Sequence, residues 1–134
     1  MLKRYLSGLA LAAMAAGAIS TSNAAEAGLA PQTSDERGVK VTVTPQALAQ
    51  ATWNFEVTLE THTQNLSDDL SRSASLVAEG KQYSPLGWQG AAPGGHHRKG
   101  VLRFKAIVPQ PGLIELRIRL AGETSPRSFK WILK

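Results

Sequence analysis

The sequence predicts an all-β fold, an antiparallel β-sandwich of six or seven short strands with an immunoglobulin-like or cupredoxin-like topology. Apolar and polar residues alternate along most of the chain after residue 38, which is typical of strands with one buried face. Proline and glycine interrupt that alternation at short intervals, as turns do between the strands of a sandwich. The 134 residues leave room for one domain.

The alternation divides the chain into strands in a definite order. The clearest strand covers residues 114–120, where Ile and Leu alternate with Glu and Arg. Pro45, Gly80, Pro109 and Gly122 mark turns or strand ends, and only the stretch 45–51 has room for a helical turn. The other strands are expected at 39–44, 53–60, 76–78, 102–108 and 129–133. The expected core between the two sheets comprises Trp53, Phe55, Leu116, Ile118, Phe129 and Trp131.

Residues 1–27 have the pattern of a secretory signal peptide. Lys3 and Arg4 precede an apolar run of 15 residues, and small residues follow up to Ala24 and Ala27, which are both suitable cleavage positions. A membrane-spanning helix needs about 20 apolar residues, so no membrane span is expected after cleavage. We therefore expect a periplasmic or secreted protein, with a flexible leader at 28–37 and a β-sandwich domain at 38–134.

The composition narrows the possible chemistry. The chain has no Cys, and both Met residues, Met1 and Met14, lie in the expected signal peptide. Disulfides, thiolate metal sites and cysteine nucleophiles are therefore excluded. No G-x-S-x-G motif surrounds any serine, so the sequence does not predict an enzyme. The lack of an aromatic stacking platform disfavours nucleic acid as a partner.

Charge is distributed unevenly along the chain. Residues 25–97 carry eight acidic and four basic side chains, whereas residues 98–134 carry two acidic and nine basic ones. Such asymmetry marks either an anionic partner or oppositely charged strands that pair across a sheet. We favour cross-strand pairing, because the basic residues alternate with apolar ones and form no single run.

The segment 88–100 contains two of the three histidines. His96 and His97 follow Gly94 and Gly95 in a glycine-rich loop, and His62 lies at the end of an expected strand. Strand ends and loops meet at the rims of a sandwich, so we expect His62 to lie close to His96 and His97. Imidazole and carboxylate ligands suit zinc, copper(II) or nickel. The sequence therefore predicts a divalent metal site, with zinc or copper(II) as the leading ions, formed by His62, His96, His97 and a carboxylate, Glu60 first and Asp68 or Asp69 as alternatives.

An alternative function uses the same loop without a metal. Gly94 and Gly95 can adopt positive φ, which lets backbone amides converge on an anion. Arg98 and Lys99 would add positive charge beside them. In this interpretation the residues 94–99 bind an anion or a protein of the cell envelope.

Several motifs together resemble the signature of a group of small exported bacterial proteins. They are Thr61-His62, Trp88-x-Gly90 and Gly94-Gly95-His96-His97-Arg98-x-Gly100-x-Leu102-x-Phe104. The resemblance covers about residues 39–133, and its most specific part is the Gly-Gly-His-His-Arg element. The group reads Asp-Thr-His-Ser where this chain has Glu60-Thr61-His62-Thr63, so no strict geometric role follows for the acidic residue. The resemblance implies export and a shared role for His62 and the loop, and it implies no particular ligand.

Overall fold

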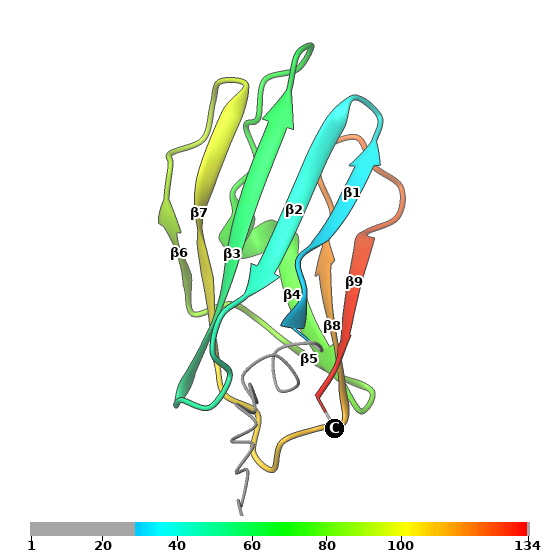
Figure 1. Cartoon of the computed structure of the whole chain (residues 1–134). Helices are drawn as coiled ribbons and strands as arrows, with labels where there is room; N and C mark the ends of the chain where they lie inside the picture. Colours follow the sequence, from blue (N-terminus) through cyan, green and yellow to red (C-terminus); the bar gives the residue numbers. More distant parts are fainter. Residues whose placement is uncertain (1–28, 134) are drawn as a thin grey trace, which may run out of the picture.

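The computed structural model describes residues 29–133 and consists of two antiparallel sheets packed face to face (Figure 1). One sheet has five strands in the order β1-β2-β3-β7-β6, and the other has four in the order β5-β4-β8-β9. No helix within residues 29–133 is long and apolar enough to cross a membrane. The elements are β1 (Gln32–Glu36), β2 (Val39–Pro45), β3 (Thr52–Thr61), α2 (Leu70–Ser73), β4 (Ala74–Ala78), β5 (Lys81–Tyr83), β6 (Gly87–Gly90), β7 (His97–Lys105), β8 (Leu113–Ile118) and β9 (Arg127–Ile132).

The predicted all-β sandwich is confirmed, and the structure corrects several details of it. The described residues form nine strands, more than the six or seven expected. The expected flexible leader at 28–37 is wrong for Gln32–Glu36, which pairs with β2 as strand β1. The helical turn expected at 45–51 is instead found at Leu70–Ser73, where the Asp69 carboxylate accepts the Ser71 amide and caps the helix. The predicted signal peptide lies outside the described residues.

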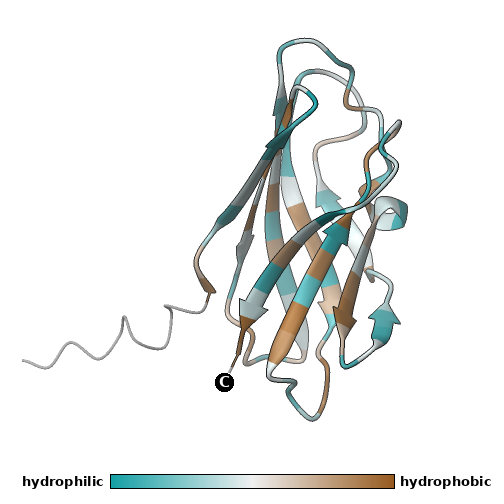
Figure 2. Ribbon diagram, turned by 90° about the vertical axis from the view of Figure 1, so that its right-hand side faces the viewer, coloured by the Kyte–Doolittle hydropathy of each residue, from teal (hydrophilic) through white to brown (hydrophobic). Residues whose placement is uncertain are grey.

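The core lies between the two sheets and is built by the alternation seen in the sequence. Figure 2 shows this as brown and teal segments that follow one another along the strands. The Phe55 ring packs edge-on against Phe104, with centroids 5.7 Å apart, and lies 5.8 Å from Trp131. Full burial of each large apolar side chain stabilises the fold by roughly 1.5–3 kcal/mol. The six predicted core residues are all buried, namely Trp53, Phe55, Leu116, Ile118, Phe129 and Trp131.

Two turns at the ends of the sandwich need unusual backbone. Glu36 pairs with Val39 and Ala78 with Lys81, so the hairpin loops contain two residues each. Both residues of each loop have positive φ: 52° and 78° at Arg37 and Gly38, and 51° and 78° at the other loop. This is the type I′ geometry that matches the twist of paired strands, and glycine at the second position makes it inexpensive.

Arg127 connects the two sheets at the side formed by β1 and β9. Its buried guanidinium pairs with the Glu123 carboxylate at 2.7 Å. The remaining donors bind backbone carbonyls of the β1–β2 hairpin, at 3.1 Å from Ser34 O, 2.9 Å from Glu36 O and 2.7 Å from Val39 O. One arginine thus fixes the hairpin of the five-stranded sheet to the first residue of β9.

The Gln32 side chain continues this connection along β9. Its amide oxygen accepts the Lys130 backbone N–H at 3.0 Å, and its amide nitrogen donates to the carbonyl of the same residue. Just before β1, the Ala30 carbonyl accepts the indole N–H of Trp131 at 2.8 Å. The side-chain amide therefore takes the place that a neighbouring strand would occupy.

Candidate functional site

All three histidines of the chain meet at one end of the sandwich. His62 directly follows β3, His96 ends the loop between β6 and β7, and His97 begins β7. Glu60, on the outer face of β3, lies among them. A depression at this rim, which we call the histidine depression, is lined by Asp35, Gly38, Lys40, Glu60, Thr61, His62, His96 and His97. The structure thus brings together the residues from which the sequence predicted a metal site.

The strand register explains why these side chains share a face. Asp35 pairs with Lys40, Lys40 with Glu60, and Glu60 with His97, which places alternating charges in one row across four strands. His97 Nδ1 lies 3.6 Å from Glu60 Oε1, and both side chains are largely exposed. His62 directly follows β3, two residues beyond Glu60, and lines the same depression. The sequence did not indicate Asp35 as part of this site, because apolar and polar residues do not alternate along β1.

The loop that carries His96 is held in place by backbone hydrogen bonds. The Gly94 amide donates to Leu66 O at 2.7 Å, and the Gly95 amide donates to Asn65 Oδ1 at 2.9 Å. In return, Gly95 O accepts the Leu66 amide, and His96 O accepts the Thr61 amide, each at 2.9 Å. Gly94 and Gly95 do have the expected positive φ, 119° and 77°. Their amides already donate within the protein, however, so the predicted anion-binding role of these two glycines is corrected.

Arg98 also differs from the expectation. Its side chain is 1% exposed and points into the protein beside Leu59, its partner on β3. The guanidinium donates to Leu66 O at 3.2 Å, Asp68 O at 2.7 Å and Ala91 O at 3.2 Å. Burial lowers the pKa of Arg98, and the carboxylates of Asp68 and Asp69 partly oppose this shift. The proposed role of Arg98 in binding an external anion is therefore corrected to a structural one.

Trp88 completes the support beneath the loop. Its ring lies under the Arg98 guanidinium, with the guanidinium carbon 5.6 Å from the ring centroid, and its indole N–H donates to Ala91 O at 2.9 Å. A Cβ atom at Gly100 would lie 2.5 Å from the Trp88 ring, and one at Gly90 would lie 2.4 Å from Gly100 Cα. The glycines at 90 and 100 therefore allow β6, β7 and the indole to approach closely. The sequence showed these residues only as part of a loop.

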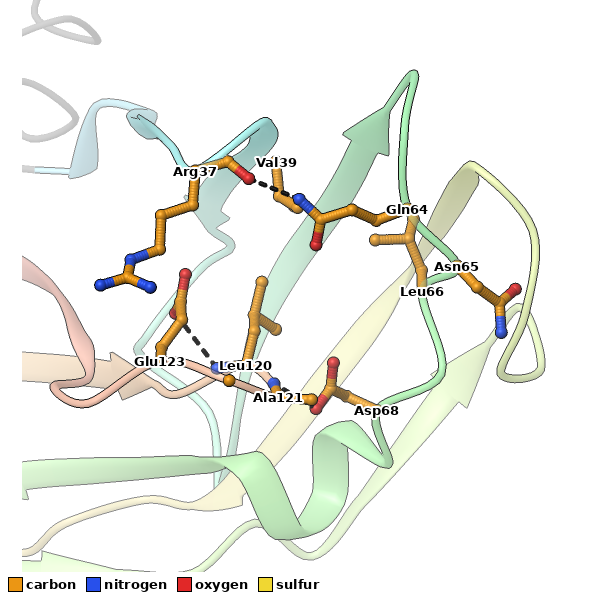
Figure 3. A pocket seen from close by; sticks show the side chains of 10 residues that line it. Arg37, Val39, Gln64, Asn65, Leu66, Asp68, Leu120, Ala121 and Glu123 are labelled. Carbon is orange, nitrogen blue, oxygen red and sulfur yellow. Dashed lines mark hydrogen bonds between the residues drawn. The ribbon is translucent and has the colours of Figure 1, made fainter.

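The segment 62–69 makes hydrogen bonds to the loops at the same rim. Figure 3 shows the Gln64 side chain directed toward Arg37, whose carbonyl accepts its amide, and Asn65 directed the opposite way toward the loop before β7. Asp68 Oδ1 accepts the Ala121 amide at 2.9 Å in the turn between β8 and β9. Hydrogen bonds thus connect the segment 62–69 to three other loops. The Asp68 and Asp69 carboxylates serve a turn and a helix cap, and neither lines the histidine depression.

The exposed groups are not arranged as a finished metal centre. Within residues 29–133, no three His, Cys, Asp or Glu side chains are close enough to hold a metal ion as they stand. Any coordination therefore requires rotation of side chains on a fixed backbone. Lys99, the remaining residue of the predicted anion site, is exposed and lies 3.8 Å from Glu56 on the outer face of the sheet.

Comparisons with known proteins add no functional assignment. No protein-family model matches the chain, and no curated protein is significantly similar to it. The functional argument therefore depends on the chemistry of the histidine depression.

Proposed function

We propose that this chain is an exported, non-enzymatic binding protein that holds a divalent metal ion at the histidine depression. The observation that carries the proposal is that all three histidines and Glu60 line one depression, although they come from two strands and two loops. Their donors are imidazole nitrogens and a carboxylate, which suit zinc or copper(II). Export is supported by the signal-peptide pattern of residues 1–27, and places the protein in the periplasm or outside the cell.

Strand register and chain order support a shared site for these donors. Glu60 and His97 are directly opposite on β3 and β7, and His62 follows two residues after Glu60. All three side chains are exposed and line the histidine depression. Metal binding would require rotation of the exposed imidazoles until their nitrogens lie about 2.0–2.1 Å from a zinc ion. His96 offers a fourth donor from the loop.

The fixed loop favours this proposal over the metal-free alternative. Of the four residues expected to bind an anion or an envelope protein, Gly94, Gly95 and Arg98 already bond inside the protein. Only Lys99 keeps its charged group at the surface. In contrast, the imidazoles of His62, His96 and His97 are directed toward solvent in the histidine depression. A rigid backbone also limits the entropy that coordination would cost.

Metal titration of protein without a histidine tag tests the proposal directly. The protein is freed of metal with a chelator and titrated with Zn²⁺ or Cu²⁺ in a calorimeter. Because the chain has three histidines and all lie here, any imidazole-dependent binding reports on this site. We expect His62→Ala and His97→Ala each to weaken binding by at least about tenfold.

A matched control comes from the same strand. Glu56 lies on the outer face of β3, four residues from Glu60, and is paired with Lys99. Glu60→Ala should weaken metal binding, whereas Glu56→Ala, which removes the same charge from the same face, should change it by less than about twofold. Affinity should also fall as the pH is lowered, because protons compete with the metal for imidazole nitrogens. Equal affinities of the wild type and His62→Ala would contradict the proposal.

A further inference from the structure

We infer that the outer face of the four-stranded sheet carries a second binding site, for a phosphate group, formed by Arg72, Arg117 and Arg119. These three arginines line one hollow on the face opposite the core. No Asp or Glu lines the hollow with them. The other lining residues are Ser73, Ala74, Ser75, Gln82, Ser84 and Pro126. This site is independent of the histidine depression, which lies on the five-stranded sheet.

The strand pattern places the arginines on one face. Arg117 and Arg119 are two residues apart, so their side chains leave the same side of β8 and of the chain just after it. The Arg119 amide donates to Ser73 O at 3.0 Å, which holds this residue beside the end of α2, where Arg72 lies. On the other side, Arg117 is in register with Ser75 on β4. Three separate elements thus fix the positions from which the guanidinium groups enter the hollow.

Existing ion pairs leave positive charge in the hollow. Arg117 Nη2 lies 3.0 Å from Glu115 Oε1, and the Glu115 carboxylate also accepts the Ser128 hydroxyl. This pair orients Arg117 and neutralises part of its charge. Arg72 lies 3.6 Å from Asp69, but both side chains are strongly exposed, so this pair is weak. With Arg119 in addition, the group carries three positive charges against two carboxylates at its margin.

The chemistry of these groups matches a phosphate group. Planar guanidinium groups bind phosphate oxygens through two parallel hydrogen bonds, and several arginines around one anion are a common solution for phosphate recognition. The hydroxyls of Ser75 and Ser84 and the amide of Gln82 supply neutral donors in the same hollow. A bound phosphate would also relieve the repulsion among the three guanidinium groups. Among the basic residues of the segment 98–134, only those on β7 lie beside the acidic residues of β3. Arg117 and Arg119 are not among them, so the excess of basic residues in this segment supports the inference.

The test uses inorganic phosphate as the probe in an NMR titration at low ionic strength. Saturable shifts are expected at the amides of 73–75 and 117–119 and at the arginine side chains. Arg117→Gln/Arg119→Gln should weaken phosphate binding by at least about tenfold. Arg119 is exposed and lies beyond the end of β8, so Arg119→Gln alone should fold even if the double variant does not. It should also weaken phosphate binding. Arg103→Gln, on β7 of the other sheet, is the matched control and should change the affinity by less than about twofold.

A second set of measurements identifies the source of the phosphate group. Sedimentation with vesicles of phosphatidylglycerol and phosphatidylcholine is compared with vesicles of phosphatidylcholine alone. Phosphate saturation without vesicle binding supports a soluble phosphate compound, and binding confined to the anionic vesicles that Arg119→Gln abolishes supports a lipid headgroup. Absence of both, or phosphate shifts that persist unchanged in the double variant, would overturn the inference. Zinc binding should be the same in all these variants, so this result is separable from the metal proposal.

Discussion

Replacement of Arg98 by methionine tests whether this buried cation supports the histidine loop. Methionine keeps much of the apolar stem and removes the guanidinium. Leu66 O would still accept the Gly94 amide, and Ala91 O would still accept the Trp88 indole. The carbonyl of Asp68 would lose the hydrogen bond it accepts from Arg98.

The expected loss of stability follows from these contacts. Leaving the partly buried Asp68 carbonyl without this partner costs up to about 3 kcal/mol, and loss of the contact with Trp88 adds about 0.5–2 kcal/mol. Removal of a buried charge offsets part of this cost, since the guanidinium is desolvated and its Nε has no hydrogen-bond partner within residues 29–133. We therefore expect Arg98→Met to lower the free energy of unfolding by about 1–4 kcal/mol.

Urea unfolding followed by tryptophan fluorescence measures this change. Arg103→Met, on the same strand but partly exposed, is the control and should cost less than about 1 kcal/mol. Arg98→Lys keeps the charge but lacks the planar fork that reaches three carbonyls, so it should also be destabilised. Metal affinity, measured where Arg98→Met is still folded, should fall with the stability. A free energy of unfolding within about 0.5 kcal/mol of the wild-type value would refute the structural role of Arg98.

Three further substitutions test other parts of the fold. Gly100→Ala places a Cβ atom 2.5 Å from the Trp88 ring and should cost about 1–3 kcal/mol, visible in urea unfolding and in the near-ultraviolet circular dichroism of the indole. Glu123 has an ordinary pKa of 4.5; burial opposes its ionisation, but hydrogen bonds and charge from Arg127 outweigh burial and lower the pKa in the folded state. Its contribution to stability is therefore present above about pH 4.5 and lost as the pH falls through the lower folded value, so Glu123→Gln should flatten the acid part of the stability profile. Gln32→Ala removes two hydrogen bonds to the edge of β9 and should cost about 1–2 kcal/mol, and an unchanged unfolding midpoint would show that the side-chain amide contributes nothing.

The sequence predicted those parts of the fold in which burial alternates residue by residue. β8 is an example, since every second side chain from Ile114 onward is buried. β1 was missed because its residues are polar and none of its side chains is fully buried, so no alternation marks it. It is held by contacts from residues almost a hundred positions away, which no local pattern shows. The expected cross-strand pairing of opposite charges is seen at Glu56, which lies 3.8 Å from Lys99 on β7.

The sequence predicted which residues lie near one another at the candidate site better than it predicted what each residue does. Proximity of His62 to the loop followed from the expectation that a strand end and a loop share a rim. The direction of Arg98 was not predicted, because Gly94 and Gly95 make the segment look like a free loop, and a basic residue beside it looks exposed. Strand pairing extends to His97, however, so the next side chain points into the core.

The side-chain amide of Gln32 has a consequence for how molecules of this protein meet one another. An unpaired edge strand invites a second molecule to add its own strand, which is a common first step in aggregation. Here the Gln32 side chain makes hydrogen bonds to the backbone N–H and carbonyl of Lys130 on β9. Arg127 donates to two backbone carbonyls of β1, so these groups are not free to pair with a strand of another molecule. The outer strands at the other side, β5 and β6, have only three and four residues and offer short templates. Loss of β1 would therefore do more than lower stability, because it would open the longest protected edge to neighbouring molecules and make the protein prone to self-association.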